Sequence, residues 1–409
     1  MRVTIINQFY VPDISPTAHL SASLAEDRAA RGDEVTVITS WGGYVPVAEE
    51  EKKSRKGDNP RVYRIWTPRM GKATHLKRLI DYASFYFGAL WRMLRLKRQD
   101  VIISLTTPPY IALTAVAHRM LHPGTRIILW SMDCYPDAAE RLGVIKDRGL
   151  LSRIMRWINR FLFRRLNHLV CLDTAMVDLL VGQYGPENKQ LPSTVIPNWE
   201  KASFFPADAS PEPWEEIKQL RDQGNFIILY LGNTGYGHQF DTVLDAAEKL
   251  ADENVIFFFV GGGKRWEELK QQKQARNLSN IILHGYVPKE QTPGVMAAAD
   301  CALITLSDIS LGVMSPSKLH SNLAMHLPVI YIGPEKSNVD DCLKRFGCGI
   351  SLTHGRVEEL VGFIRSLKSE PEKLAALRQK ARQAFDEAYC DEQTLPQFDE
   401  VIRSVMKTS

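Results

Sequence analysis

A lysine that follows a turn of serine and proline is the clearest sign of chemistry in this sequence. The turn Ser315–Ser317 lies between the apolar run Cys301–Thr305 and Lys318, where a helix is expected to begin. Serine and proline favour helix starts, and the free backbone N–H groups of a helix start attract phosphate. A lysine there is unfavourable for the helix dipole unless it meets an anion. Ser315, Ser317 and Lys318 therefore predict a phosphate site, with a solvated lysine in a surface turn as the alternative.

Two glycine-rich turns follow apolar runs in the same half of the chain. Gly232–Gly237 comes after Phe226–Leu231, and Gly261–Gly263 comes after Val255–Val260. Glycine has no side chain and adopts conformations that other residues avoid, so backbone in these turns can approach a phosphate or a base closely. The carboxyl ends of parallel strands lie at one edge of a sheet, where ligands bind. These turns are therefore candidates for a nucleotide site.

Two polar residues of the first half are expected at the corresponding edge of another sheet. Asp133 follows the strand-like run Arg126–Ser131, and His19 opens a helix expected at His19–Arg31, after the strand Val3–Asn7. A carboxylate just beyond a parallel strand points toward the ligand crevice. Asp133 and His19 are therefore candidate substrate or catalytic residues. A turn-capping aspartate and an ordinary surface or core histidine are the alternatives.

The elements that position these residues are short apolar strands alternating with helices, which is typical of an α/β protein with parallel sheets. With 409 residues, of which 44% are hydrophobic, the chain is long enough for two domains. The first strand–helix–strand unit lacks the G-x-G-x-x-G pattern that a dinucleotide pyrophosphate requires, so a Rossmann dehydrogenase is disfavoured.

Five motifs along the chain resemble family 4 glycosyltransferases of the GT-B fold, of the bacterial polysaccharide and lipopolysaccharide type. They are Ile196-Pro197-Asn198-Trp199, Tyr230–Gly235, Phe259–Gly263, His284–Val287, and Pro316–Leu319 followed by Pro328-Val329-Ile330. Each motif is short, but all five occur in the order of the family. The resemblance implies two Rossmann-like parallel-sheet domains that face a central cleft. It assigns 1–198 to an acceptor-binding domain, 199–390 to a nucleotide-sugar domain, and 391–409 to a helix that packs back on the first domain.

The resemblance also implies an activity. The expected enzyme is a retaining glycosyltransferase that moves a hexosyl or N-acetylhexosaminyl group from a nucleotide-diphosphate sugar to a glycan or lipid-linked acceptor in cell-surface polysaccharide synthesis. No metal and no other cofactor is expected. Asp133 and His19 are the implied catalytic residues. The implied donor-binding residues are Gly232, Asn233, His238, Gly262, Tyr286, Val287, Ser315, Ser317 and Lys318.

The sequence departs from the family where charged donor contacts are usual. Two glutamates that the family carries eight residues apart fall by register on Val313 and Ser321, and an arginine and a lysine are replaced by Asn233 and His238. A catalytically weak or inactive GT-B binding partner at the membrane is therefore the alternative function. A nucleotide-sugar epimerase on the same fold would need a general acid–base pair, and the sequence offers none.

Basic helices in the first half predict a membrane surface as a partner. The net charge of the chain is +4, and the excess of Lys and Arg lies in residues 1–198. The basic stretch Lys72–Arg98 has helical spacing, and within Leu150–Leu166 four arginines fall on one stripe opposite a broad apolar face: Arg153, Arg156, Arg160 and Arg164. This pattern is typical of a helix lying on an anionic bilayer, with a packed helix and a solvated face as the alternative. Nucleic acid is disfavoured because no recognition motif accompanies the charge.

Cysteine use and hydropathy indicate a compartment. The six cysteines are scattered without metal-ligand spacing or a C-x-x-C pair, so reduced structural thiols are expected. No leader-like segment and no run of about 20 apolar residues occurs. The sequence therefore predicts a cytoplasmic protein that is peripheral on the inner face of the cell membrane.

Overall fold

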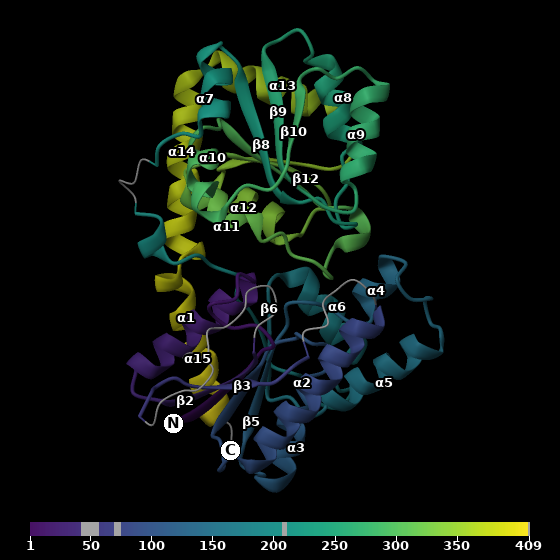
Figure 1. Ribbon diagram of the computed structural model, residues 1–409, viewed down its shortest axis with the longest axis vertical. Coiled ribbons are helices and arrows are strands. Elements are labelled where there is room, and N and C mark those ends of the chain that lie inside the picture. The colour runs from purple at the N-terminus through teal and green to yellow at the C-terminus, as the bar shows by residue number, and fades with distance from the viewer. Residues whose placement is uncertain (42–56, 69–74, 207–210, 408–409) are drawn as a thin grey trace. The chain divides into compact units, whose positions relative to one another are not determined.

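The computed structural model describes residues 1–41, 57–68, 75–206 and 211–407 (Figure 1). The chain divides into two compact units. Met1–Pro197 and Thr394–Ser409 form the first unit, and Asn198–Gln393 forms the second. Each unit contains one parallel sheet, so the expected pair of Rossmann-like domains is confirmed.

The sheet of the first unit has the strand order β3-β2-β1-β4-β5-β6-β7 in the described residues. Its strands are β1 (Arg2–Ile6), β2 (Glu34–Ser40), β3 (Arg61–Ile65), β4 (Val101–Ser104), β5 (Arg126–Trp130), β6 (His168–Cys171) and β7 (Ser193–Val195). The strand β3 was not predicted, because Arg61 and Arg64 interrupt its apolar residues and the whole strand is only half-buried. The strand order changes direction between β1 and β4, and ligands of such sheets bind at the carboxyl ends of strands at this point.

Helices cover both faces of the first sheet. They are α1 (Pro16–Ala30), α2 (His75–Arg95), α3 (Leu113–Leu121), α4 (Asp137–Arg141), α5 (Leu150–Phe163), α6 (Thr174–Tyr184) and α15 (Asp391–Lys407). Figure 1 shows α1 and α15 on one side of the strands and α2 and α3 on the other. Of the basic stretch Lys72–Arg98, the first residues lie outside the described part of the chain. None of the helices in the described ranges is both long enough and apolar enough to cross a bilayer.

The last helix belongs to the first unit because buried contacts hold it there. The ring of Phe398 in α15 meets the ring of Trp130 in β5 edge to face, at 4.6 Å between centroids. The guanidinium of Arg28 in α1 pairs with Asp399 of α15 and also with Asp33. A buried arginine is stable only when it is paired in this way.

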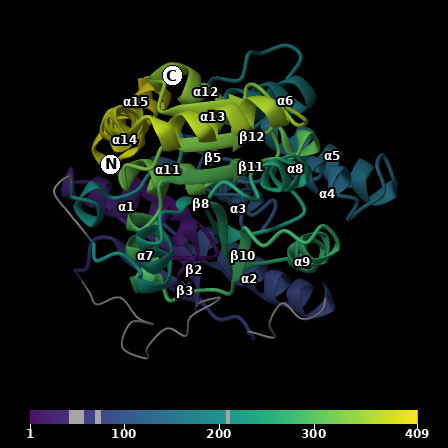
Figure 2. The ribbon, with the colours of Figure 1, turned by 90° about the horizontal axis from the view of Figure 1, so that it is seen from above.

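The sheet of the second unit has the order β10-β9-β8-β11-β12-β13. Its strands are β8 (Phe226–Asn233), β9 (Val255–Gly262), β10 (Ile281–His284), β11 (Cys301–Thr305), β12 (Val329–Ile332) and β13 (Gly349–Leu352). Its helices are α7 (Glu215–Asp222), α8 (Asp241–Lys249), α9 (Trp266–Ala275), α10 (Thr292–Ala297), α11 (Lys318–Ala324), α12 (Asn338–Phe346), α13 (Val357–Ser369) and α14 (Pro371–Ala384). In the view of Figure 2, α13 runs alongside β12.

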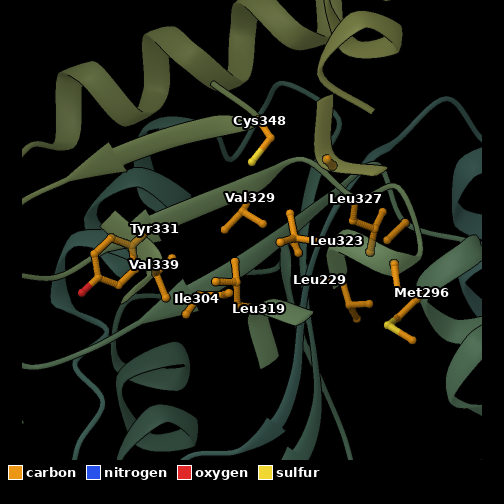
Figure 3. Close-up of a cluster of buried hydrophobic side chains, with 14 of the residues drawn as sticks. Leu229, Met296, Ile304, Leu319, Leu323, Leu327, Val329, Tyr331, Val339 and Cys348 are labelled. Atoms are coloured by element: carbon orange, nitrogen blue, oxygen red, sulfur yellow. The ribbon is translucent and has the colours of Figure 1, made fainter. Parts of the chain in front are cut away.

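The second sheet is buried on both faces, and successive side chains of its strands enter two different cores. In β8, Ile228 and Tyr230 pack with α8 and α13, whereas Ile227 and Leu229 pack with α10, α11 and α12. Figure 3 shows the second of these cores, in which Leu319 of α11 lies beside Ile304 of β11. This anchor places Lys318, the neighbour of Leu319, at the carboxyl edge of the sheet.

Candidate functional site

The two glycine turns of the second unit meet at the carboxyl ends of β8 and β9. Asn233 pairs with Gly262 in the sheet register, and Gly232 and Gly263 have φ of +124° and +137°. A Cβ atom on Gly263 would lie 2.3 Å from Oδ1 of Asn233, and one on Gly262 would lie 2.9 Å from Cε2 of Tyr286. Atoms of Asn233, Thr234 and Tyr286 occupy the space where side chains would lie, so glycine lets the two turns pack closely together.

Lys318 lies beside Gly232 in the first of these turns. Its Nζ is 3.4 Å from the centroid of the Tyr230 ring and donates a hydrogen bond to the carbonyl oxygen of Asn233 at 3.3 Å. A Cβ atom on Gly232 would lie 3.0 Å from Cε of Lys318. Burial lowers the pKa of the Lys318 ammonium well below its usual range. A phosphate bound here would restore the charged form, because an anion stabilises the ammonium.

His238 is adjacent to this lysine, but it does not supply positive charge. Burial, followed by the charge of Lys318, lowers the pKa of His238 to about 3. Its Nδ1–H donates to the carbonyl oxygen of Thr305 at 2.7 Å. The assignment of His238 to the donor site stays a prediction. His238 is a neutral side chain that joins the turn after β8 to the end of β11.

The turn before α11 makes no side-chain cap, and its assignment to a phosphate stays a prediction. Ser317 is the N-cap residue but makes no capping hydrogen bond with its side chain, and Ser315 is half-buried. The helix α11 has only seven residues, so its dipole is weak. The electrostatics of this site therefore depend on Lys318 more than on the helix start. Val287 is half-buried and packs against the core of the unit.

The two positions where the family carries glutamates contribute no charge here. Val313 is 2% exposed, and the hydroxyl of Ser321 donates to the carbonyl oxygen of Lys318 at 3.4 Å. The physical consequence is a donor site whose wall on this side is less acidic than the family pattern implies.

Two further residues of this site were not assigned from the sequence. Tyr230 supports Lys318 through its ring, and Arg265 donates to the carbonyl oxygen of His238 while it pairs with Glu268. Tyr230 opens one of the quoted motifs, so its position was the available signal. For Arg265 the available signal was its place just after the second glycine turn, because a cation there can lie close to a phosphate.

The structure places both catalytic candidates at the carboxyl edge of the first sheet. Asp133 is exposed just beyond β5, and its backbone N–H donates to Oγ1 of Thr106 at 3.1 Å. His19 is half-buried in the first turns of α1, which begins at Pro16 rather than at His19. Proline is favoured at the start of a helix because its missing N–H has no partner there in any case.

The arginine stripe of α5 is divided. Arg153, Arg160 and Arg164 are exposed, whereas Arg156 pairs with Glu140 and lies 3.4 Å from Asp137. Arg156 therefore forms an ion pair within the unit, with its side chain 21% exposed, and the assignment of the stripe to a membrane stays a prediction. The apolar side chains Ile154 and Trp157 are 47% and 65% exposed, so the surface of α5 is both basic and apolar.

Family models match both units of the chain. Residues 18–199 match the family described as Glycosyl transferase 4-like domain, and residues 213–384 match the family described as Glycosyl transferases group 1. Together with the two parallel sheets, these matches define the class: the chain belongs to the family 4 glycosyltransferases of the GT-B fold.

Individual relatives are similar over 62% to 98% of the chain. WcaI of Escherichia coli (strain K12), named for colanic acid biosynthesis, is 26% identical and covers 98% of this chain and 100% of its own length. WbjE of Pseudomonas aeruginosa, named as a glycosyltransferase, is 23% identical over 62% of each chain. Among solved structures, sucrose-phosphate synthase of Thermosynechococcus elongatus has a TM-score of 0.73 at 12% identity and covers 100% of both chains. Anabaena HepE, solved with UDP and glucose, has a TM-score of 0.69 at 15% identity and covers 99% of this chain and 100% of its own.

Proposed function

We propose that this glycosyltransferase moves a sugar, with retention of configuration, from a nucleotide-diphosphate sugar to a glycan or lipid-linked acceptor in cell-surface polysaccharide synthesis. The observation that carries the proposal is Lys318, held over the Tyr230 ring and against Gly232. The name of WcaI, which refers to colanic acid, supports the polysaccharide class. HepE, solved with UDP and glucose, supports a nucleotide-sugar donor.

The proposed chemistry needs the diphosphate leaving group to be stabilised as its bond to the sugar breaks. Preorganised charge and N–H groups commonly supply several kcal/mol for such a step. Here Lys318 supplies the charge, and the glycine turns after β8 and β9 let backbone approach the phosphates. We assign Tyr286, whose side chain is 69% exposed beside Gly262, to the nucleoside. Asp133 and His19 keep their assignment to the reacting sugar and the acceptor, and the reaction is proposed to need no metal.

We also propose that the first unit binds an anionic membrane. Alongside the three exposed arginines of α5, the helix α2 exposes Phe87 and Trp91, at 74% and 59%. Arg95 lies 3.9 Å from the Trp91 ring, so cations and apolar rings alternate on this helix as well. Exposed aromatic rings beside arginine suit the boundary between lipid headgroups and chains. The expected localisation is the inner face of the cell membrane.

The experiment for the donor is a hydrolysis screen. The full chain is incubated with UDP-, GDP- and TDP-sugars, with and without a chelator, and release of nucleoside diphosphate is measured. We expect one donor to be hydrolysed slowly and calorimetry to show binding of the matching nucleoside diphosphate. Binding without turnover of any donor, even with membrane extracts as the source of acceptor, would favour the inactive binding partner. Loss of turnover on chelation would contradict the metal-free reaction.

A further inference from the structure

A small cavity beside Asp133 in the first unit has no role in the function proposed so far. It lies at the carboxyl ends of β4 and β5, the edge where parallel sheets bind ligands. Its volume is about 30 Å³, and a cavity needs roughly 10–15 Å³ on the same measure to hold one water. The cavity therefore has room for a group of a few heavy atoms, but not for a sugar ring or a prenyl chain.

The cavity has an apolar interior and a polar rim. The apolar lining residues are Leu105, Leu129, Leu162, Phe163 and Leu180. Its polar lining residues include Thr106 and Asn159. An apolar interior favours a methyl group, because burying a methyl-sized group is worth roughly 0.8 kcal/mol.

Among the polar residues that line the cavity, Thr106 can offer a donor and Asn159 an acceptor to a ligand. Oγ1 of Thr106 accepts from the backbone N–H groups of Met132 and Asp133, each at 3.1 Å, so its own O–H hydrogen can be donated. Nδ2 of Asn159 donates to the carbonyl oxygen of Tyr135 at 2.6 Å, so its Oδ1 can accept. A donor and an acceptor beside an apolar interior match a secondary amide that carries a methyl group.

The backbone at the cavity wall is unusual as well. Tyr110, which lines the cavity, has φ of +67°. This left-handed conformation costs an ordinary residue roughly 1–2 kcal/mol, and residues held in it cluster at ligand sites. Tyr110 therefore keeps an unfavourable backbone conformation where it lines the cavity.

We infer that this cavity binds the 2-acetamido group of the acceptor sugar. The acetyl methyl lies against the leucines and Phe163, the amide oxygen accepts from Thr106, and the amide N–H donates to Asn159. The inference rests on the proposed function and deepens it, because it states that the acceptor presents a 2-acetamido-2-deoxy sugar to the first unit. Asp133, on the rim of the same cavity, then lies next to the sugar that receives the new bond.

Saturation-transfer NMR on the full chain tests this inference without knowledge of the donor. The probes are methyl 2-acetamido-2-deoxy glycosides of glucose and galactose, each compared with the methyl glycoside that has a 2-hydroxyl group. We expect at least one acetamido glycoside to bind about fivefold more tightly than its partner, since the methyl alone accounts for roughly fourfold. The acetyl methyl protons should receive the strongest saturation. Equal binding of both members of each pair would overturn the inference.

A cavity-filling variant gives a second, independent readout. Ala112 lines the cavity and is 1% exposed, so Ala112→Val should abolish the preference for the acetamido glycoside. Ala115, on the same α3 segment, is fully buried but does not line the cavity, and Ala115→Val serves as the matched control that keeps the preference. Thr106→Ser retains the hydroxyl group and should also keep the preference for the acetamido glycoside. A preference that survives in Ala112→Val would also overturn the inference.

The same samples separate this inference from the proposed function. Binding of nucleoside diphosphate involves residues of the second unit, so none of these three variants should change it. A protein that binds nucleoside diphosphate but shows no acetamido preference overturns the inference and leaves the proposed function standing. A wild-type protein that binds no nucleoside diphosphate contradicts the proposed function itself.

Discussion

Lys318 is the residue on which donor binding is predicted to depend most. Lys318→Ala should weaken binding of the matching nucleoside diphosphate by about 1.5–3 kcal/mol, the range for a charge-assisted hydrogen bond. Calorimetry measures this directly, and Lys270→Ala, an exposed lysine of α9, is the control. Unchanged affinity in Lys318→Ala would remove this lysine from the site.

The lowered pKa of Lys318 adds a second readout to the same titration. Because burial depresses the pKa in the free protein and a phosphate raises it, binding at alkaline pH should take up a proton. The heat of binding should then vary with the ionisation enthalpy of the buffer. This dependence should disappear in Lys318→Ala, whereas a merely structural lysine would give no buffer dependence in either protein.

Asp133 is the residue whose catalytic role is most open to test. If it stabilises positive charge that develops on the transferred sugar, Asp133→Asn should lower turnover by roughly 10²-fold while donor affinity changes little. Asparagine caps turns as well as aspartate does, so a capping role predicts near-normal turnover. Kinetics with the donor found in the hydrolysis screen decide between them, and Asp147→Asn, at another exposed aspartate of the first unit, is the control.

At the scale of elements, α5 makes the membrane proposal testable with a matched pair of variants. Replacing Arg153, Arg160 and Arg164 by glutamine should weaken binding to anionic vesicles by roughly 3 kcal/mol, about 1 kcal/mol for each charge near the surface. Binding by the wild type should also fall steeply with salt. Vesicle sedimentation measures both effects.

Arg156→Gln is the informative control for this helix. Because Arg156 pairs with Glu140 and Asp137, its loss should lower the free energy of unfolding of the first unit while vesicle binding stays close to that of the wild type. Equal loss of vesicle binding in Arg156→Gln and in the triple variant would argue against a surface formed by the exposed face of α5.

At the scale of the whole molecule, buried histidines predict sensitivity to acid in both units. Burial lowers the pKa of His168 in the first unit and of His320 in the second to about 4, and that of His238 to about 3. The unfolded chain therefore binds more protons than the folded chain below pH about 6.5, the ordinary histidine value. Stability should be complete above this pH and should decrease as the pH falls toward the folded values.

Denaturant unfolding at a series of pH values between 7 and 4 tests this pH dependence. The unfolding of each unit is followed by a signal from that unit. Nε2 of His168 is hydrogen-bonded to Oγ1 of Thr194 at 2.9 Å. The variant His168→Gln keeps a polar side chain at this position but does not titrate. This variant should flatten the pH dependence of the first unit only. A steep dependence that persists unchanged would assign the acid sensitivity to other groups.

The sequence by itself determined the elements and the motifs of the site. Short apolar runs ending in glycine predicted β8 and β9 correctly, because strands buried on both faces leave a local pattern. The turn before Lys318 and the position of Asp133 beyond β5 were also readable, since a motif and the strand that precedes it are neighbours in the chain. The strand β3 could not be predicted in this way, because it is only half-buried and contains two arginines.

Only the tertiary structure decided the charge state and the accessibility of these residues. His238 is neutral because surrounding side chains exclude water, and Lys318 is supported by Tyr230, which is far from it in the sequence. Arg156 belongs to the same stripe as its neighbours but meets Glu140. The cavity beside Asp133 combines residues of the segment that follows β4 with residues of β5, α5 and α6. The burial of side chains, their ion pairs and the cavities between them arise from contacts between distant segments of the chain. The periodicity of the sequence therefore does not predict them.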